Sequence, residues 1–133
     1  MGTTLFGAFL SVFNHAHGAI SPMIARGAAA EQAAADYLAQ QGLVLVTRNF
    51  RCRLGEIDLI MRDGKILVFV EVRARASREF GGAAASIDSR KQHKLIATAN
   101  MYLTTISPTP PCRFDAVLME GGGLQWLQNA FQV

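Results

Sequence analysis

Cysteine is scarce in this sequence of 133 residues and an aromatic-rich platform is lacking, and each of these excludes a class of protein. The two cysteines, Cys52 and Cys112, lie far apart and form neither a CxxC motif nor a cluster with histidine. This argues against a disulfide framework and a zinc site, and it favours a reducing, cytoplasmic location. Phe50 and Phe80 are too few to form a platform on which the bases of single-stranded nucleic acid could stack.

Long hydrophobic runs are also absent. The apolar run at residues 5–13 is too short to span a bilayer, and no basic segment precedes it as in a secretory signal. We therefore expect residues 1–21 to form a poorly ordered apolar tail without a membrane partner. Apolar residues make up 50% of the chain and charged residues 17%. This globular composition predicts one domain over residues 22–133.

Hydrophobic periodicity and turn residues predict the order α-β-β-β-α-β-β. An alanine-rich helix is expected over residues 22–41, ended by Gly42, and a second helix over residues 86–106, capped by Ser86 or Asp88. Strands are expected over residues 43–50, 56–62, 65–75, 112–120 and 124–131. The fold class that follows is α/β (α+β), with a mixed central β-sheet flanked by helices.

The dipeptide Asp63-Gly64 predicts a two-residue hairpin turn in which Arg62 pairs with Lys65. Side chains alternate along strands, so one face of this hairpin is wholly apolar and must be buried. Its residues are Ile57, Leu59, Met61, Ile66, Val68, Val70 and Val72.

The opposite face of the hairpin gathers acids at the end away from the turn. Asp58 and Glu71 are expected to be diagonal neighbours with Cβ atoms about 7 Å apart, near enough to share one cation. Arg73 lies on the same face and could relieve their repulsion instead. On the first helix, Glu31 interrupts an apolar stripe, and spacing alone leaves open whether it reaches solvent or a site.

Basic residues are concentrated in one segment of the chain. Residues 48–94 hold eleven Lys or Arg and six Asp or Glu, a net charge of +5 within a chain of net charge +3. Basic charge gathered around a few acids suits a phosphate-bearing partner, whereas the alternative is a merely soluble basic surface.

Asp58 followed by Glu71-Val72-Arg73 resembles the motif of the restriction-endonuclease-like superfamily, written PD-(D/E)XK, with Arg73 where the lysine usually stands. More narrowly, the segments AAAEQAAADYLAQQGL, GEIDLI, FVEVRAR and RFDAV resemble the uncharacterised YraN-like family. This resemblance covers about residues 24–120. The family carries a helical glutamate before its first strand, and Glu31 matches it.

The resemblance implies a metal-dependent endonuclease, similar to archaeal Holliday-junction resolvases, that hydrolyses phosphodiester bonds in branched or structured DNA. Asp58, Glu71 and Arg73 would be catalytic, and Mg²⁺ (or Mn²⁺) would be held by Asp58, Glu71 and Glu31. A homodimer is compatible with it, because relatives that cut both strands tend to be dimers. Since arginine cannot take a proton, a non-catalytic nucleic-acid-binding domain on the same scaffold is the alternative.

Further expectations concern basic residues around this site. Arg53, Arg75, Lys91 and Lys94 are expected to contact phosphates, although a solvated helix face would explain the two lysines almost as well. Asp115, in the matched segment RFDAV, is expected to form a structural ion pair. A third reading treats the protein as structural, with every acid paired to an arginine and no cavity between them.

Overall fold

The computed structural model describes residues 22–75 and 87–132, together with all side chains in these ranges except those of residues 22–26 and 75. In chain order, the elements are helix α2 (Pro22–Gln40), strands β1 (Val44–Cys52), β2 (Gly55–Asp63) and β3 (Ile66–Arg75), helix α4 (Ser89–Leu103), and strands β4 (Cys112–Glu120) and β5 (Gly123–Phe131). The predicted order and the predicted mixed sheet are confirmed. The expected tail over residues 1–21 lies outside the described residues.

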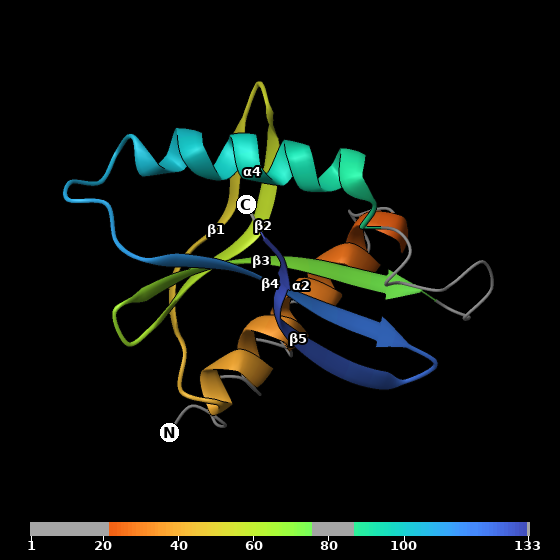
Figure 1. Cartoon of the computed structure of the whole chain (residues 1–133). Coiled ribbons are helices and arrows are strands. Elements are labelled where there is room, and N and C mark those ends of the chain that lie inside the picture. Colours follow the sequence, from red (N-terminus) through yellow and green to blue (C-terminus); the bar gives the residue numbers. More distant parts are fainter. Residues whose placement is uncertain (1–21, 76–86, 133) are drawn as a thin grey trace.

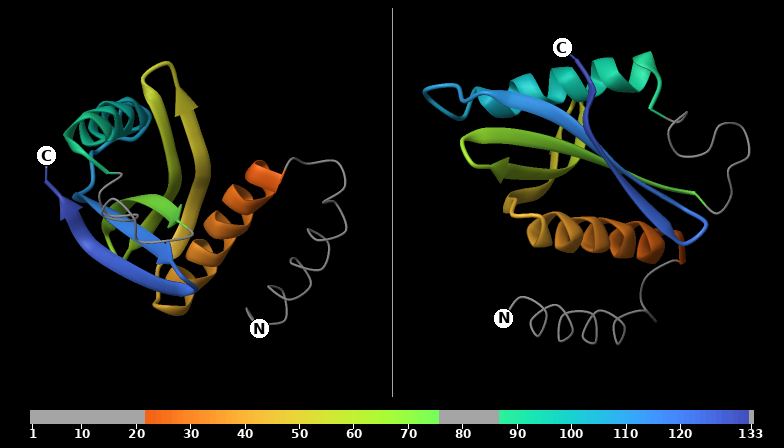
Figure 2. Two further views of the ribbon diagram at one scale, coloured as in Figure 1. Left: turned by 90° about the vertical axis from the view of Figure 1, so that its right-hand side faces the viewer. Right: turned by 60° about the horizontal axis from the view of Figure 1, so that its bottom comes forward.

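The five strands form one sheet in the order β1-β2-β3-β4-β5, in which only the β3–β4 pair is parallel. The two helices cover opposite faces of this sheet (Figures 1 and 2). Helix α2 packs Ala34, Ala35 and Leu38 against one face, and α4 packs Leu95 and Ala99 against the other. Two apolar layers therefore hold the sheet from both sides. Neither described helix is both long and apolar enough to cross a membrane.

Helix α2 ends as its sequence predicts. Gly42 adopts φ +100°, a conformation that side chains disfavour, and the Leu43 N–H donates to the Leu38 carbonyl oxygen at 3.0 Å. These are features of a Schellman motif, in which the residue after glycine also packs back on the helix. Leu43 and Leu38 are buried in the same cluster. The motif directs the chain from α2 into β1.

The β2–β3 turn differs from the predicted one by one residue. Asp63 pairs with Ile66, so the two turn residues are Gly64 and Lys65, and every pair is shifted by two residues from the predicted register. Gly64 at φ +60° suits the first position of a type II′ turn. Asp63 stays in the strand, where its carboxylate accepts a hydrogen bond from Arg113 Nη1 at 2.9 Å. A shift of two residues leaves each side chain on its predicted face.

The single apolar face predicted for the hairpin is wrong at Ile57. Ile57 packs in the cluster that faces α4, whereas Leu59 packs in the cluster that faces α2. The reason is that β2 pairs with β3 only as far as Leu59–Val70 and continues beyond this point with β1 alone. The outer part of the β1–β2 hairpin rises beside α4 (Figure 1). There a Cβ on Gly55 would meet Thr98 Oγ1 at 2.8 Å, so only glycine allows this approach.

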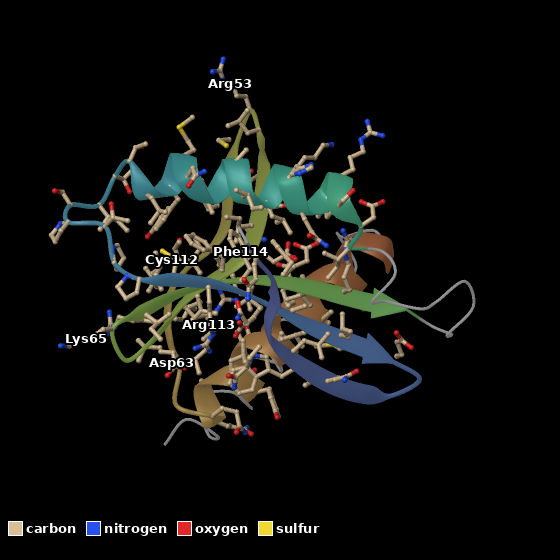
Figure 3. The ribbon with its side chains drawn as sticks, viewed as in Figure 1. Arg53, Asp63, Lys65, Cys112, Arg113 and Phe114 are labelled. Carbon is tan, nitrogen blue, oxygen red and sulfur yellow. The ribbon has the colours of Figure 1, made fainter. Side chains whose placement is uncertain are left out.

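Asp115 forms the expected ion pair, inside the sheet rather than in a cleft. Its fully buried carboxylate accepts hydrogen bonds from Arg113 Nε at 3.0 Å, Trp126 Nε1 at 3.0 Å and the Asn129 N–H at 2.9 Å. Arg113 extends from β4 toward Asp63 at the end of β2 (Figure 3). The cluster ties three strands together and is fully satisfied, so its role is structural.

Candidate functional site

Asp58 lies at the point where β2 and β3 separate. The pairing of β2 with β3 stops at Leu59–Val70, and the Asp58 Oδ2 atom accepts a hydrogen bond from the Val72 N–H at 2.9 Å. A side-chain oxygen thus takes the place of the missing strand partner of Val72. The same register, continued by one residue, sets Asp58 opposite Glu71 and not diagonal to it. The separation of the strands therefore brings the carboxylate of Asp58 beside that of Glu71.

The two oxygens of Glu71 have different surroundings. The side chain is only 4% exposed, and its Oε2 lies 3.0 Å from Arg73 Nε and 3.5 Å from Lys91 Nζ. The contact of Arg73 Nε with Oε2 is an ion pair without hydrogen-bond alignment, since Arg73 Nε has no hydrogen-bond partner among the described residues. Glu71 Oε1 has no hydrogen-bond partner among them either. A buried carboxylate oxygen without a partner is costly and is rare in folded proteins. Glu71 therefore presents one free acceptor.

Lys91 reaches Glu71 from the first turn of α4. Asp88 caps this helix, as predicted, and its Oδ1 accepts a hydrogen bond from the Lys91 N–H at 2.9 Å. This cap fixes the backbone of the residue whose ammonium enters the site, while the Lys91 side chain stays 32% exposed. The helix therefore brings a flexible positive charge to a buried negative one.

Helix α2 contributes Glu31, which is held by Asn49 of β1. Asn49 Nδ2 donates to Glu31 Oε1 at 2.9 Å and lies 3.5 Å from Glu56 Oε2. Glu56 in turn accepts from Arg51 Nε at 2.6 Å on the surface. Asn49 has φ +53°, which asparagine tolerates better than most residues. Asn49 thus links the helical acid to the end of β2.

A single open pocket of about 880 Å³ brings most of the predicted residues together. Its lining includes Glu31, Asp58, Glu71, Arg73 and Lys91. Glycine and alanine of α2 and the glycine turn between β4 and β5 form other parts of the wall, and the lining contains no aromatic side chain. The pocket can therefore admit a polar, charged group and offers it no stacking surface.

The electrostatics of the pocket favour added positive charge. Burial and the charge of Glu71 raise the pKa of Asp58 to about 7, although the bond from the Val72 N–H opposes the rise. A protonated Asp58 also gains a hydrogen bond with Glu71. Burial raises the pKa of Glu31, the bond from Asn49 opposes this, and the charge of Asp58 adds to it. In the absence of another cation, a proton supplies the compensation.

The residues of the pocket fit a divalent cation in their chemistry, and two of them also fit it in their placement. Carboxylate oxygens are the ligands that Mg²⁺ prefers, and Glu71, which has one unpartnered oxygen, lies beside Asp58. Within residues 22–75 and 87–132, however, no group of three or more His, Cys, Asp or Glu side chains is arranged as a metal site. Glu31 is bonded to Asn49 and also lies within hydrogen-bond reach of Asp58, so it stands next to one of the other two acids.

Two of the residues expected to contact phosphates, Lys94 and Arg53, do not line this pocket. Lys94 is exposed on α4, one turn beyond Lys91. Arg53 is exposed in the turn between β1 and β2, and its side chain projects from the tip of that hairpin (Figure 3). Arg75 ends β3, and its side chain lies outside the described part of the chain. Of the three whose side chains are described, Lys91 alone lines the pocket and reaches Glu71.

Sequence reasoning missed Asn49. Its signal is weak, because an asparagine inside a predicted strand suggests only a local departure from extended backbone. The bulge between Leu45 and Thr47 in the same strand was not predictable from alternation either. Only the packing of α2 on the sheet reveals that Asn49 faces Glu31.

Comparisons with known proteins place the chain among related sequences. A model of the uncharacterised protein family UPF0102 matches residues 30–119. The chain is similar to UPF0102 proteins of Janthinobacterium sp. (strain Marseille), with 56% identity over 80% of this chain and 86% of the relative, and of Nitrosospira multiformis, with 54% identity over 81% and 93%. A UPF0102 protein of Cupriavidus taiwanensis is 57% identical over 80% of this chain and 82% of its own length. The names of these relatives state no activity.

Proposed function

The chain belongs to the uncharacterised protein family UPF0102, and we propose that its acidic pocket hydrolyses phosphodiester bonds of branched or structured DNA with the help of a divalent cation. The proposal includes membership of the restriction-endonuclease-like superfamily. Asp58 and Glu71 resemble the two acids of the superfamily motif, and the mixed sheet resembles its fold. Its main support is Glu71, a buried acid with one unpartnered oxygen, which lies beside Asp58 in an open pocket that also contains Arg73 and Lys91.

Asp58 and Glu71 would hold the cation, and Glu31, which lies within hydrogen-bond reach of Asp58, would join them. When bound, Mg²⁺ or Mn²⁺ supplies Lewis acidity toward a phosphoryl oxygen and toward water. This charge would also replace the proton that the acids otherwise require. The raised pKa of Asp58 therefore agrees with a site designed for a cation.

Arg73 and Lys91 would bind the phosphodiester. A guanidinium can contact two phosphate oxygens at once, and an ammonium acts as a compact point charge. Both lie at the Glu71 end of the pocket, so a phosphate placed there would lie next to the acids. Arg73 cannot serve as a base, and the water must lose its proton by another route.

A second candidate function is nucleic-acid binding without catalysis. Arg73 in the position of the motif lysine favours it, as does the absence of a three-acid metal group among the described residues. The purely structural reading has less support, because it requires every acid to be paired and no cavity to exist. Asp58, whose carboxylate accepts from the Val72 N–H and not from an arginine, and the pocket of about 880 Å³ both oppose that reading.

The test is cleavage of linear, flapped and four-way DNA with Mg²⁺, with Mn²⁺ and with a chelator. Asp58→Asn and Glu71→Gln should abolish cleavage, whereas Asp63→Asn, the same change at the other end of β2, should retain it. Cleavage that survives both pocket variants would refute the proposed site. No cleavage by the native protein, together with salt-sensitive DNA binding that survives both substitutions, would favour the binding domain.

A further inference from the structure

Two cations compensate one oxygen of Glu71, and they come from different elements. Arg73 lies two residues further along β3, so its guanidinium approaches Glu71 from the same strand. Lys91 comes from α4 and contacts the same Oε2 at the longer distance of 3.5 Å. The buried acid is therefore held by one cation of its own strand and by one that depends on a second element.

Lys91 is the cation that can leave. Its ammonium sits on a four-carbon stem, and a third of the side chain is exposed to solvent. Its backbone is fixed by the Asp88 cap, so movement of the side chain needs no movement of the helix. Phosphate oxygens entering the pocket would offer this ammonium an alternative partner without desolvating it further.

We infer that Lys91 couples cation binding to substrate binding: in the free protein its ammonium competes with a divalent cation for Glu71, and an entering phosphodiester draws it away. This inference rests on the proposed function. It gives Lys91 the role of a positioning residue, acting through Glu71, in addition to that of a phosphate contact.

The sign of the coupling follows from charge. A positive ammonium 3.5 Å from Glu71 Oε2 repels a cation at the same carboxylate and satisfies part of its negative charge. Transfer of the ammonium to a phosphate removes both effects, so substrate strengthens cation binding. By linkage, the cation strengthens substrate binding by the same factor. A variant without this charge should bind the cation more tightly and lose the coupling.

The first measurement is the affinity of the whole chain for Mn²⁺ in the absence of DNA. The electron paramagnetic resonance signal of free Mn²⁺ reports how much of the ion is bound. Lys91→Met should bind Mn²⁺ about fivefold more tightly than the native protein, the lower end of typical couplings. Lys65→Met is the matched control, because Lys65 lies at the β2–β3 turn, outside the pocket (Figure 3). It should leave Mn²⁺ affinity unchanged. Lys91→Arg keeps the charge and should behave as the native protein does.

The second measurement is the affinity for a four-way DNA junction with phosphorothioate linkages, by fluorescence anisotropy with Mn²⁺ and with a chelator. Mn²⁺ should raise the affinity of the native protein about fivefold more than that of Lys91→Met. Comparing proteins on the same DNA removes the contribution of Mn²⁺ bound to the DNA itself.

Two results would overturn the inference and can be told apart. If Mn²⁺ binds in an Asp58-dependent way but Lys91→Met binds it no more tightly, or Lys91→Arg binds it as tightly as Lys91→Met, the inference fails and the proposed function stands. If none of the proteins binds Mn²⁺ with or without the junction, the proposed function fails and the inference fails with it.

Discussion

Replacing Asp58 by asparagine should stabilise the metal-free protein at alkaline pH. The asparagine oxygen can still accept the hydrogen bond from the Val72 N–H, and its amide can donate to Glu71 as a protonated Asp58 does. What the substitution removes is a negative charge that is buried beside another one. The protein would thus gain stability by losing a group that the proposed function requires, a common trade-off at active sites.

The size of the effect follows from the pKa of Asp58, which rises from 3.8 to about 7 on folding. Between these values the folded protein holds a proton that the unfolded chain has released, so raising the pH destabilises the native protein over this window and has no further effect above it. The full difference corresponds to about 4 kcal/mol, of which about 3 kcal/mol falls between pH 5 and pH 8. We therefore compare the free energy of unfolding of Asp58→Asn with that of the native protein at each pH. The difference between the two proteins should be about 3 kcal/mol larger, in favour of Asp58→Asn, at pH 8 than at pH 5.

The assay is denaturant unfolding of both proteins at pH 5 and pH 8 in the presence of a chelator. Comparing the two proteins cancels the titration of groups that they share. Saturating Mn²⁺ at pH 8 should raise the stability of the native protein and leave Asp58→Asn little changed. If Asp58→Asn lowers the free energy of unfolding by the same amount at both pH values, the reasoning is refuted. Asp58 would then serve only to accept the hydrogen bond from the Val72 N–H.

Three further predictions concern the site and the fold. Arg73→Lys should raise the single-turnover cleavage rate about tenfold, because lysine can exchange a proton where arginine cannot; an unchanged or lower rate would assign Arg73 to phosphate binding alone. Gly55→Ala should lower the free energy of unfolding by about 2 kcal/mol, because a Cβ would meet Thr98 Oγ1 at 2.8 Å and φ is +154°. Thr98→Ala should restore part of this loss in the double variant, and strict additivity would argue against the contact. Asp115→Asn should cost about 3 kcal/mol in the same denaturant assay, because it removes the fully buried charge partner of the largely buried Arg113 and leaves only the half-exposed Asp63, and a loss below 1 kcal/mol would contradict that account.

The sequence was sufficient to predict the fold because its local signals agreed with one another. Alternation located the strands, Gly42 and Asp88 marked the helix ends, and only the parallel β3–β4 pair required a crossover helix. The hairpin register was wrong because a distant partner decided it. Arg113 on β4 holds Asp63 in the strand, and a turn propensity cannot foresee an ion pair with a residue fifty positions away.

The site was predictable only where it depends on alternation along the strands. A shift of the hairpin register by two residues leaves Asp58, Glu71 and Arg73 on the same face of the sheet. Their grouping in the pocket was therefore predicted correctly although the turn was not. The approach of Lys91 depends on how α4 packs, and the role of Asn49 depends on a positive φ. Ile57 changed layers because β2 leaves β3 at Leu59. None of these follows from periodicity within one strand.

The separation of β2 from β3 links these observations. If the two strands paired along their whole length, the Val72 N–H would bond to a β2 carbonyl oxygen, and Asp58 would have no reason to lie against the backbone. Because the strands separate, Asp58 is drawn in beside Glu71, and the glycine at position 55 lets the freed hairpin close on α4, whose first turn supplies Lys91. One local break in a sheet thereby creates both the buried negative charge and the nearby cation that responds to it. A fold selected only for stability would pair the strands, so the break itself argues for a function that needs the acids.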